Sequence, residues 1–342
     1  MFYFFSTIIK DIYMKKYDKE KINDILIIKL GALGDVINTF PAVIRIKDYF
    51  SSARVHWLIA PLSFPLVSEH PAVDNVIVFD KNNIKKSFFK IKKKIGKIKF
   101  DIAIDFQRTL KSGFFCMMSK AGRRIGFDKK RCKEMTWLYP FERIPPSDPG
   151  KHMLLQYLEF SDYLGAYSSD ISWDISYSDV KNYPIPKKYV VLNIGATKKA
   201  NLWTPEGFSS LAASVKSRYG LISVLTGGKE DAEFAVKISA LSNHTVINLV
   251  GKTSIHDLKN VIGNSELVVS CDTGPMHLAV ALNKNVVALF GPSDPARTGP
   301  FKGDVIQKKL DCQPCNKRKC PDPLCMKAIT YEDVINGIDR LL

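Results

Sequence analysis

At 342 residues the chain is long for a single hydrophobic core, and this length favours two domains of ordinary size. The hydrophobic fraction of 46% and the charged fraction of 25% are typical of a soluble globular protein, and they exclude a collagen-like chain or one that is disordered throughout. A formal net charge of +16 indicates an anionic partner, but charge alone does not separate nucleic acid, acidic lipid headgroups and phosphorylated sugars.

Residues 1–24 are predicted to form an amphipathic N-terminal extension. Apolar side chains recur at Phe5, Ile8, Ile9 and Ile12, a spacing that places them on one face of a helix. The stretch is too short to span a bilayer and lacks the cationic start and cleavage site of a secretory signal. Two interpretations stay open: an interfacial helix that rests on a membrane, and a helix packed on the protein's own surface.

From residue 24 onward, short apolar runs alternate with helical patterns, which predicts parallel β-α-β units. Residues 171–188 are rich in Ser, Asp and Pro and are predicted to link a domain at 25–170 to a second one at 189–342. In such sheets, ligands bind beyond the carboxyl ends of the strands. The predicted strands lie within 24–30, 54–60, 73–80, 100–107, 189–197, 221–228, 244–251, 266–274 and 285–293.

The first predicted strand ends in two glycines and a lone carboxylate, in the sequence "IIKLGALGD". Asp35 follows Gly31 and Gly34 at the point where a buried strand gives way to a helix. That position exposes side chains at the edge of a sheet, so Asp35 is a candidate functional carboxylate.

The sequence "CDTGPMH" at 271–277 follows another apolar strand and begins a helix. Gly274 lacks a Cβ, and the free N–H groups at a helix start can bind a phosphate. His277, one turn into the helix, can donate to an anionic group, although a lone histidine is more often structural. The alternative is that Asp272 and Thr273 only cap the helix.

Two further loops of the second half carry glycines next to charged residues. In "NIGATKKANLW", Lys198 or Lys199 can neutralise a diphosphate, or the segment is an ordinary solvated turn. In "LTGGKED", Gly228 permits close backbone approach, while Lys229 or Glu230 can reach a ribose or a base. Neither loop matches a Walker phosphate loop or a full G-x-G-x-x-G.

The first half contains a basic stretch, "KNNIKKSFFKIKKKIGKIKF", that is predicted to form an amphipathic helix. Its lysines either form a solvated face or, together with "FQRTLKSG" and "AGRRIGFDKKR", bind an anionic second substrate.

The seven cysteines include isolated ones at Cys116, Cys132 and Cys271, a pattern that predicts a reducing, cytoplasmic location. The remaining four are Cys312, Cys315, Cys320 and Cys325. They lie in one short loop near the C-terminus, where they form either a structural zinc site or packed, redox-sensitive thiols. No cluster of His or carboxylate residues indicates a catalytic metal.

Taken in order, the segments "LGALGDVINTFPA", "FDIAIDFQRTLKSG", "RRIGFD", "CDTGPMHLAVAL", "VVALFGPSDPARTGP" and "DCQPCNKRKCPDPLCMKAIT" resemble glycosyltransferase family 9, the ADP-heptose:lipopolysaccharide heptosyltransferases. The resemblance covers nearly the whole chain after residue 24, and the cysteine loop is most similar to the heptosyltransferase II branch. It implies two Rossmann-like α/β domains facing a cleft, the glycosyltransferase B-type fold, and an inverting reaction that needs neither a metal nor a cofactor.

The resemblance also implies roles for particular residues. Asp35 is the expected catalytic base, which takes a proton from the attacking sugar hydroxyl. The expected donor is a nucleotide sugar, ADP-heptose, and the acceptor a phosphorylated or Kdo-bearing, lipid-linked core oligosaccharide presented at the inner face of the cytoplasmic membrane. The predicted donor-binding residues are Thr197, Lys198, Lys199, Gly228, Lys229, Glu230, Asp272, Thr273, Gly274 and His277. The predicted acceptor-binding residues are Gly31, Gly34, Arg108 and Lys111.

Two positions depart from the family pattern and leave the particular sugars open. Asn201 stands where many relatives have Lys, two residues before Trp203, and Asn38 stands where many have His. Three alternatives remain: a family 9 enzyme with another nucleotide sugar or acceptor, a nucleotide-sugar isomerase on the same fold, and a basic zinc-bearing nucleic-acid-binding protein. Against the last of these, the sequence contains no recognised nucleic-acid-binding module.

Overall fold

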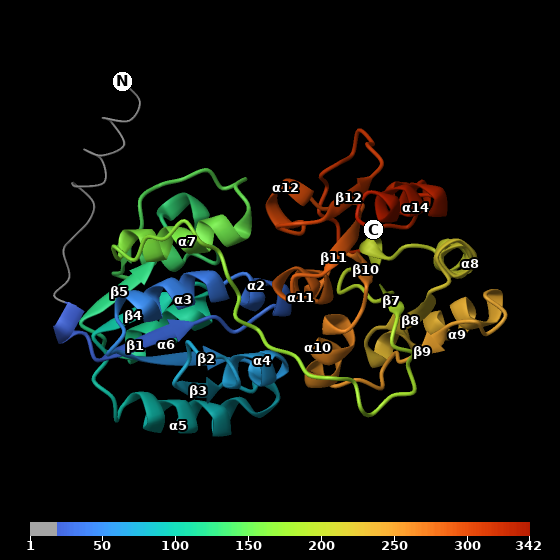
Figure 1. Ribbon diagram of the computed structural model, residues 1–342. Coiled ribbons are helices and arrows are strands. Elements are labelled where there is room, and N and C mark those ends of the chain that lie inside the picture. Colours follow the sequence, from blue (N-terminus) through green and yellow to red (C-terminus); the bar gives the residue numbers. More distant parts are fainter. Residues whose placement is uncertain (1–18) are drawn as a thin grey trace. The chain divides into compact units, whose positions relative to one another are not determined.

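A computed structural model describes residues 19–342 (Figure 1). Most of the predicted N-terminal extension, residues 1–18, therefore lies outside the described part. The chain divides into two compact units between Asp174 and Ile175, inside the segment predicted as a linker. No helix among the described residues is long and apolar enough to cross a bilayer.

Unit 1 is built on a six-stranded sheet in the order β3-β2-β1-β4-β5-β6, in which every pair of neighbours is parallel. β1 lies in the centre and pairs with β4 in a register that sets Ile28 opposite Asp105. The loops that follow β1 and β4 therefore leave the same edge of the sheet side by side. The strands are β1 (Asp24–Ile28), β2 (Arg54–Ile59), β3 (Asn75–Val78), β4 (Ile102–Asp105), β5 (Arg123–Gly126) and β6 (Glu142–Arg143).

All five residues of β1 are buried, as expected for a central strand that helices cover on both faces of the sheet. The core between sheet and helices consists of branched apolar and aromatic side chains. A capping box between Thr109 and Ser112 fixes the start of α6 just after β4. The helices are α2 (Leu33–Ile37), α3 (Phe40–Tyr49), α4 (Phe64–Ser68), α5 (Ile84–Ile95), α6 (Leu110–Met118) and α7 (Met153–Tyr163). Short 3-10 turns lie at η1 (Lys19–Lys21), η2 (Pro61–Ser63), η3 (Lys81–Asn83), η4 (Lys129–Arg131) and η5 (Thr136–Leu138).

Unit 2 repeats this plan with a parallel sheet in the order β12-β11-β10-β7-β8-β9. β10 lies between β7 and β11, so the loops after these three strands are neighbours. The strands are β7 (Tyr189–Asn193), β8 (Ile222–Thr226), β9 (Ile247–Asn248), β10 (Leu267–Cys271), β11 (Asn285–Phe290) and β12 (Asp304–Gln307).

The first helix of unit 2 shows why its boundaries fall where they do. Thr204 caps α8 by accepting from the Gly207 N–H at 3.0 Å, and Pro205 begins the helix. Gly220 ends it with a φ of 68°, a left-handed conformation that costs glycine little. The helices are α8 (Pro205–Tyr219), α9 (Ala232–Leu241), α10 (Ile255–Gly263), α11 (Gly274–Ala281), α12 (Pro295–Thr298), α13 (Leu324–Lys327) and α14 (Tyr331–Asp339), with 3-10 turns η6 (Lys199–Asn201) and η7 (Lys229–Asp231).

The prediction of two parallel α/β units is confirmed, and each of the nine predicted strand regions contains a strand. Three strands escaped prediction: β5, β6 and β12. β6 is only two residues long, and β5 begins with two arginines, so neither carries the apolar run that identifies a buried strand. All three lie toward the outside of their sheets.

Candidate active site

Asp35 lies in the first turn of α2, one short loop after β1, where its side chain is 38% exposed. The Tyr157 hydroxyl of α7 donates to Asp35 Oδ1 at 3.0 Å. On the other oxygen, the ammonium of Lys29 lies 3.4 Å from Oδ2. The carboxylate is thus held by two partners from inside the unit while part of it stays open to solvent.

Lys29 is the residue that sequence reasoning missed. It follows β1 directly, and its side chain is buried, with 2% exposed. Its ammonium donates to the Tyr157 hydroxyl at 2.8 Å and also approaches the Phe106 carbonyl oxygen at 3.5 Å. Burial lowers the pKa of this amine to about 8, an effect that the carboxylate of Asp35 opposes and the nearby Arg108 reinforces.

The loop that carries Asp35 is tied to the loop after β4. Gln107 Oε1 accepts from the N–H groups of Leu30 and Gly31 at 3.0 and 3.2 Å. Gln107 itself is fixed by Asp105, whose Oδ1 accepts from the Gln107 N–H at 2.9 Å. These hydrogen bonds hold the turn between β1 and α2 in one conformation.

Asp105 at the end of β4 is a second buried carboxyl group that the sequence did not single out. It accepts from the Arg108 N–H at 3.2 Å and from the Ser112 hydroxyl at 3.1 Å. Burial raises its pKa to about 6, although these donors and the charge of Lys29 lower it. Its hydrogen bonds to the loop and to α6 make it a residue that organises the backbone at this edge of the sheet.

The four predicted acceptor residues differ in their surroundings. Gly31 and exposed Lys111 line one hollow of about 560 Å³ beside the loop after β1, to which Lys81 also contributes. Gly34 is buried in α2. Arg108 is buried too: it donates to the Arg131 carbonyl oxygen at 3.3 Å and stacks on the ring of Phe127. Its predicted contact with the acceptor stays a prediction.

In unit 2, the loops after β7 and β10 are joined by side chains. Asn193 at the end of β7 donates to Thr273 Oγ1 at 3.1 Å and to Ser270 Oγ at 3.0 Å. Asn201 donates to Asp272 Oδ2 at 3.1 Å. Asp272 and Thr273 are partly exposed, and Thr273 stands as the N-cap of α11 without a side-chain capping hydrogen bond.

The predicted donor residues after β7 reach a third loop. Lys198 is partly buried, and its ammonium donates to the hydroxyl of Ser293, after β11, at 3.4 Å. Thr197 and Lys199 are exposed on either side of it. Lys198 therefore joins the loops after β7 and β11, the two strands that flank β10 in the sheet, and its part in an anion site stays a prediction.

Gly228, Lys229 and Glu230 lie after β8, the strand on the other side of β7. The Gly228 N–H donates to Asp231 Oδ2 at 2.8 Å, and both Lys229 and Glu230 are exposed. Burial raises the pKa of Asp231. A Cβ at Gly195 would lie 2.2 Å from Asp231 Oδ2, so the loops after β7 and β8 pack here with no room for a side chain.

The remaining predicted positions of unit 2 are buried or dispersed. Gly274 is partly exposed at the first residue of α11, and His277 is buried one turn further on. Of the loop cysteines, Cys312 is exposed and Cys325 is buried in α13. Between residues 19 and 342, no group of three or more His, Cys, Asp or Glu side chains is arranged to hold a metal ion. The two alternatives for the four cysteines, a zinc site and packed thiols, stay predictions.

Comparison with known proteins identifies the architecture. The model of glycosyltransferase family 9 (heptosyltransferase) matches residues 88–325. The lipopolysaccharide core heptosyltransferase OpsX of Haemophilus influenzae is 28% identical over 290 residues, which are 82% of this chain and 83% of OpsX. The lipooligosaccharide heptosyltransferase 2 of Campylobacter jejuni is 27% identical over 91% of this chain and 95% of its own length.

Two solved structures share the fold. E. coli ADP-heptose lipopolysaccharide heptosyltransferase II superposes with a TM-score of 0.74 at 20% identity, covering 93% of this chain and 98% of that one. The E. coli heptosyltransferase WaaC, solved with ADP, gives 0.75 at 22% identity, covering 93% and 100%. The predicted fold class, two Rossmann-like units of the glycosyltransferase B type, is thereby confirmed.

Proposed function

The chain belongs to glycosyltransferase family 9, and from this premise we propose that it transfers a heptose from ADP-heptose to a phosphorylated or Kdo-bearing acceptor of the lipopolysaccharide inner core. Relatives that cover most of this chain carry the names of lipopolysaccharide and lipooligosaccharide heptosyltransferases. The reaction takes place at the inner face of the cytoplasmic membrane, where a lipid-linked acceptor is presented. The observation that carries the proposal is the partly exposed carboxylate of Asp35, held from behind by Lys29 and Tyr157.

Asp35 acts as the general base. A hydroxyl oxygen of the acceptor attacks the anomeric carbon of the donor, and its proton passes to the partly exposed carboxylate of Asp35. One C–O bond forms as the C–O bond to the diphosphate breaks, and the bonding electrons leave with ADP. Attack opposite the leaving group inverts the anomeric configuration.

Lys29 and Tyr157 are positioning residues for this base. A cation at 3.4 Å and a hydroxyl donor at 3.0 Å favour an ionised carboxylate, the form that can accept a proton. Because the Tyr157 hydroxyl donates to Asp35 while it accepts from Lys29, the three groups form one connected network. The network fixes the orientation of the partly exposed carboxylate group.

Unit 2 binds the nucleotide sugar and stabilises the departing diphosphate. The N–H groups in the first turn of α11 have no partner within the helix, and they favour an anion at Thr273 and Gly274. Lys198, Lys199 and Thr197 supply cations and a hydroxyl from the adjacent loop, His277 donates to the anion from the first turn of α11, and Asn201 orients Asp272. Gly228, Lys229 and Glu230 contact the nucleoside. Charge that develops on ADP meets these fixed donors.

Gly31 and Lys111, which line the hollow beside the β1 loop, contact the acceptor, and Gly34 and Arg108 remain the other two predicted acceptor residues. Lys111 and Lys81 supply the cations that a phosphate or carboxylate group of the acceptor needs, while Asp80 and Glu134 in the same lining can accept from its hydroxyl groups.

Calorimetric titration with ADP, UDP, GDP and ADP-heptose, each with and without a chelator, tests the donor assignment. Preference for the adenine nucleotide, unchanged by the chelator, is the expected result. Preference for another base reassigns the sugar but keeps the reaction, and failure to bind any nucleotide contradicts transfer from a nucleotide sugar. Strong, salt-dependent binding of RNA or DNA in place of nucleotides would support the nucleic-acid alternative.

A further inference from the structure

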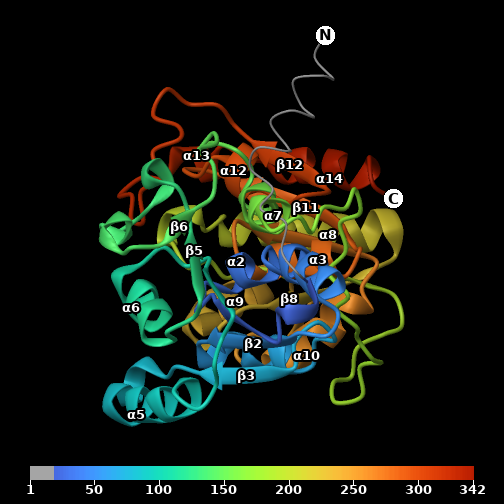
Figure 2. The ribbon, with the colours of Figure 1, turned by 90° about the vertical axis from the view of Figure 1, so that its left-hand side faces the viewer.

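Apart from Lys81, the most basic segment of the chain lies outside the proposed active-site residues. Residues 81–99 contain nine lysines and no Asp or Glu, more than half of the formal net charge of +16. All nine lysines are exposed, and within the described part of the chain none of them forms an ion pair. Most of them belong to α5, which lies beside the edge strand β3 in both ribbon views (Figures 1 and 2).

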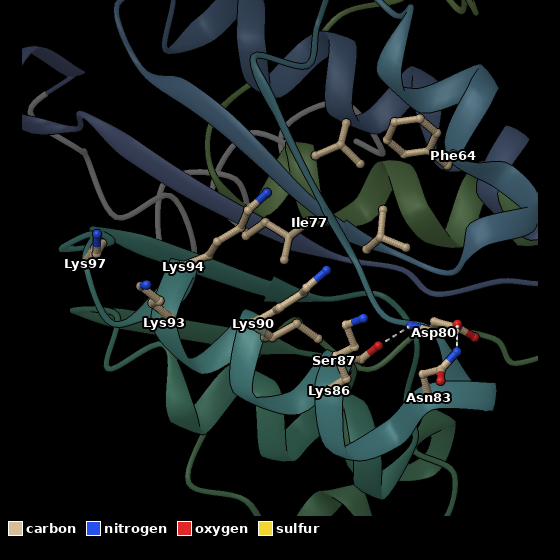
Figure 3. Close-up of a pocket in the computed structure, with 13 residues that line it drawn as sticks. Phe64, Ile77, Asp80, Asn83, Lys86, Ser87, Lys90, Lys93, Lys94 and Lys97 are labelled. Atoms are coloured by element: carbon tan, nitrogen blue, oxygen red, sulfur yellow. Dashed lines mark hydrogen bonds between the residues drawn. The ribbon is translucent and has the colours of Figure 1, made fainter.

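Lysines 86, 90 and 94 recur every fourth residue and so share one side of α5. They follow one another along the helix and reach up beside Ile77 of β3 (Figure 3). Together with Lys93 and Lys97 they line a groove of about 890 Å³. The floor of this groove is apolar, formed by Val76, Ile77, Val78, Phe64 and Ile91.

Like charges at i and i+4 destabilise a helix, so this row costs folding stability unless an anion neutralises it. Asp80 is the one carboxylate that lines the groove, and its oxygens already accept from Asn82 and Asn83. Among the described residues that line the groove, no other carboxylate is available to neutralise the row, so an anion from outside can fill this role. From Lys86 to Lys94 the rise along α5 is roughly 12 Å, so the row extends well beyond the width of a single phosphate group.

Apolar exposure distinguishes between extended anions. Phe89 lies three residues after Lys86 in α5, and its side chain is 67% exposed. Ile84, the first residue of the helix, is 58% exposed. A base of a single-stranded nucleic acid could stack on Phe89 but not on the aliphatic Ile84, whereas two exposed apolar side chains on a lysine-rich helix are typical of a helix that lies in a membrane interface.

We propose that α5 and the groove beside β3 dock on the surface of a bilayer that contains anionic phospholipids. The lysine row contacts several headgroup phosphates, and Phe89 enters the interface beside them. Docking does not depend on glycosyl transfer, because it can be measured without either substrate.

The test compares the full chain with a K86Q/K90Q/K94Q variant in co-sedimentation with vesicles of equal parts phosphatidylglycerol and phosphatidylethanolamine. At about fivefold per lysine near an anionic surface, the variant is expected to bind roughly 100-fold more weakly. Its melting temperature is expected to stay unchanged or to rise, since Gln has similar helix propensity and the repulsion is relieved. The matched control is K216Q/K237Q/K302Q, which removes the same charge from exposed lysines of unit 2 and keeps the binding.

A Phe89→Ser variant provides an independent measurement, with roughly tenfold weaker binding expected. Equal binding by K86Q/K90Q/K94Q and the unaltered chain overturns the proposal and assigns any membrane contact to another part, such as residues 1–18. Equal binding to phosphatidylcholine vesicles overturns the role of charge. Tighter binding to single-stranded RNA through the same three lysines overturns the choice of partner.

Discussion

Replacement of Lys29 by methionine tests the link between the buried amine and the base. Methionine keeps the length of the apolar stem but removes the charge that lies 3.4 Å from Asp35. A fall in the lysine pKa from its ordinary 10.5 to about 8 corresponds to about 3 kcal/mol, an order-of-magnitude figure. Because the folded pKa is the lower one, the folded chain binds fewer protons than the unfolded chain between pH 8 and 10.5.

The unfolding free energy of the natural chain therefore gains about 3 kcal/mol from this group as the pH rises from 8 to 10.5. The Lys29→Met variant lacks this gain. Urea unfolding of both proteins across that range measures the difference, and Lys130→Met, which alters an exposed lysine of the same unit, is the control. A difference that stays constant with pH would refute the reasoning about burial.

The same variant has a kinetic consequence. In the natural enzyme, loss of the Lys29 proton near pH 8 leaves Asp35 without its cation, so turnover is expected to decline on the alkaline side. Lys29→Met is expected to turn over more slowly at pH 7 and to lack this decline, while its donor KM stays unchanged. An identical alkaline decline in both proteins would show that Lys29 does not act on the base.

Two further substitutions test the networks in each unit. Tyr157→Phe removes the hydroxyl that donates to Asp35 Oδ1 and accepts from Lys29 at 2.8 Å. We expect kcat to fall about 10- to 100-fold with an unchanged donor KM, and the free energy of unfolding in urea to fall by roughly 1–3 kcal/mol. Full activity of the variant would contradict the network. Gly195→Ala places a Cβ 2.2 Å from Asp231 Oδ2, so Asp231 must move away from the Gly228 N–H, and the free energy of unfolding is expected to fall by roughly 1–3 kcal/mol with a drop in nucleotide affinity. Gly150→Ala, at an exposed glycine where the added Cβ would lie 3.3 Å from the nearest side chain, is the control, and an unfolding free energy of Gly195→Ala equal to that of the natural chain would contradict the close packing of these loops.

The architecture could be predicted because the central strands are continuous apolar runs separated by helical patterns. Asp35 and Thr273 could be singled out because each follows such a run at a recognisable turn. The residues that hold Asp35 in place could not be predicted from the sequence. Lys29 looks like an ordinary strand-end lysine, and Tyr157 lies 122 residues from Asp35, so only the tertiary fold brings the three together.

Arg108 illustrates the opposite limit of sequence reasoning. An arginine in a loop after a strand predicts a ligand contact, and this contact stays a prediction, but the sequence does not show that the guanidinium is buried on Phe127 or that the Arg108 N–H donates to Asp105 from a residue with a φ of 65°. The sequence does not indicate a role for Asn193, because it is the last residue of a buried strand, yet its side-chain amide joins the ends of β7 and β10 by donating to Ser270 and Thr273.

Turnover of Asp35→Asn tests the central claim most directly. Asparagine keeps the size of the side chain and can still accept from Tyr157, but it cannot take up a proton at neutral pH. If Asp35 is the general base, transfer from ADP-heptose to a Kdo-bearing acceptor falls by at least about 100-fold in the variant, while ADP binds to it as tightly as to the natural chain. Undiminished transfer by Asp35→Asn would contradict the assignment of the base and, with it, the proposed mechanism.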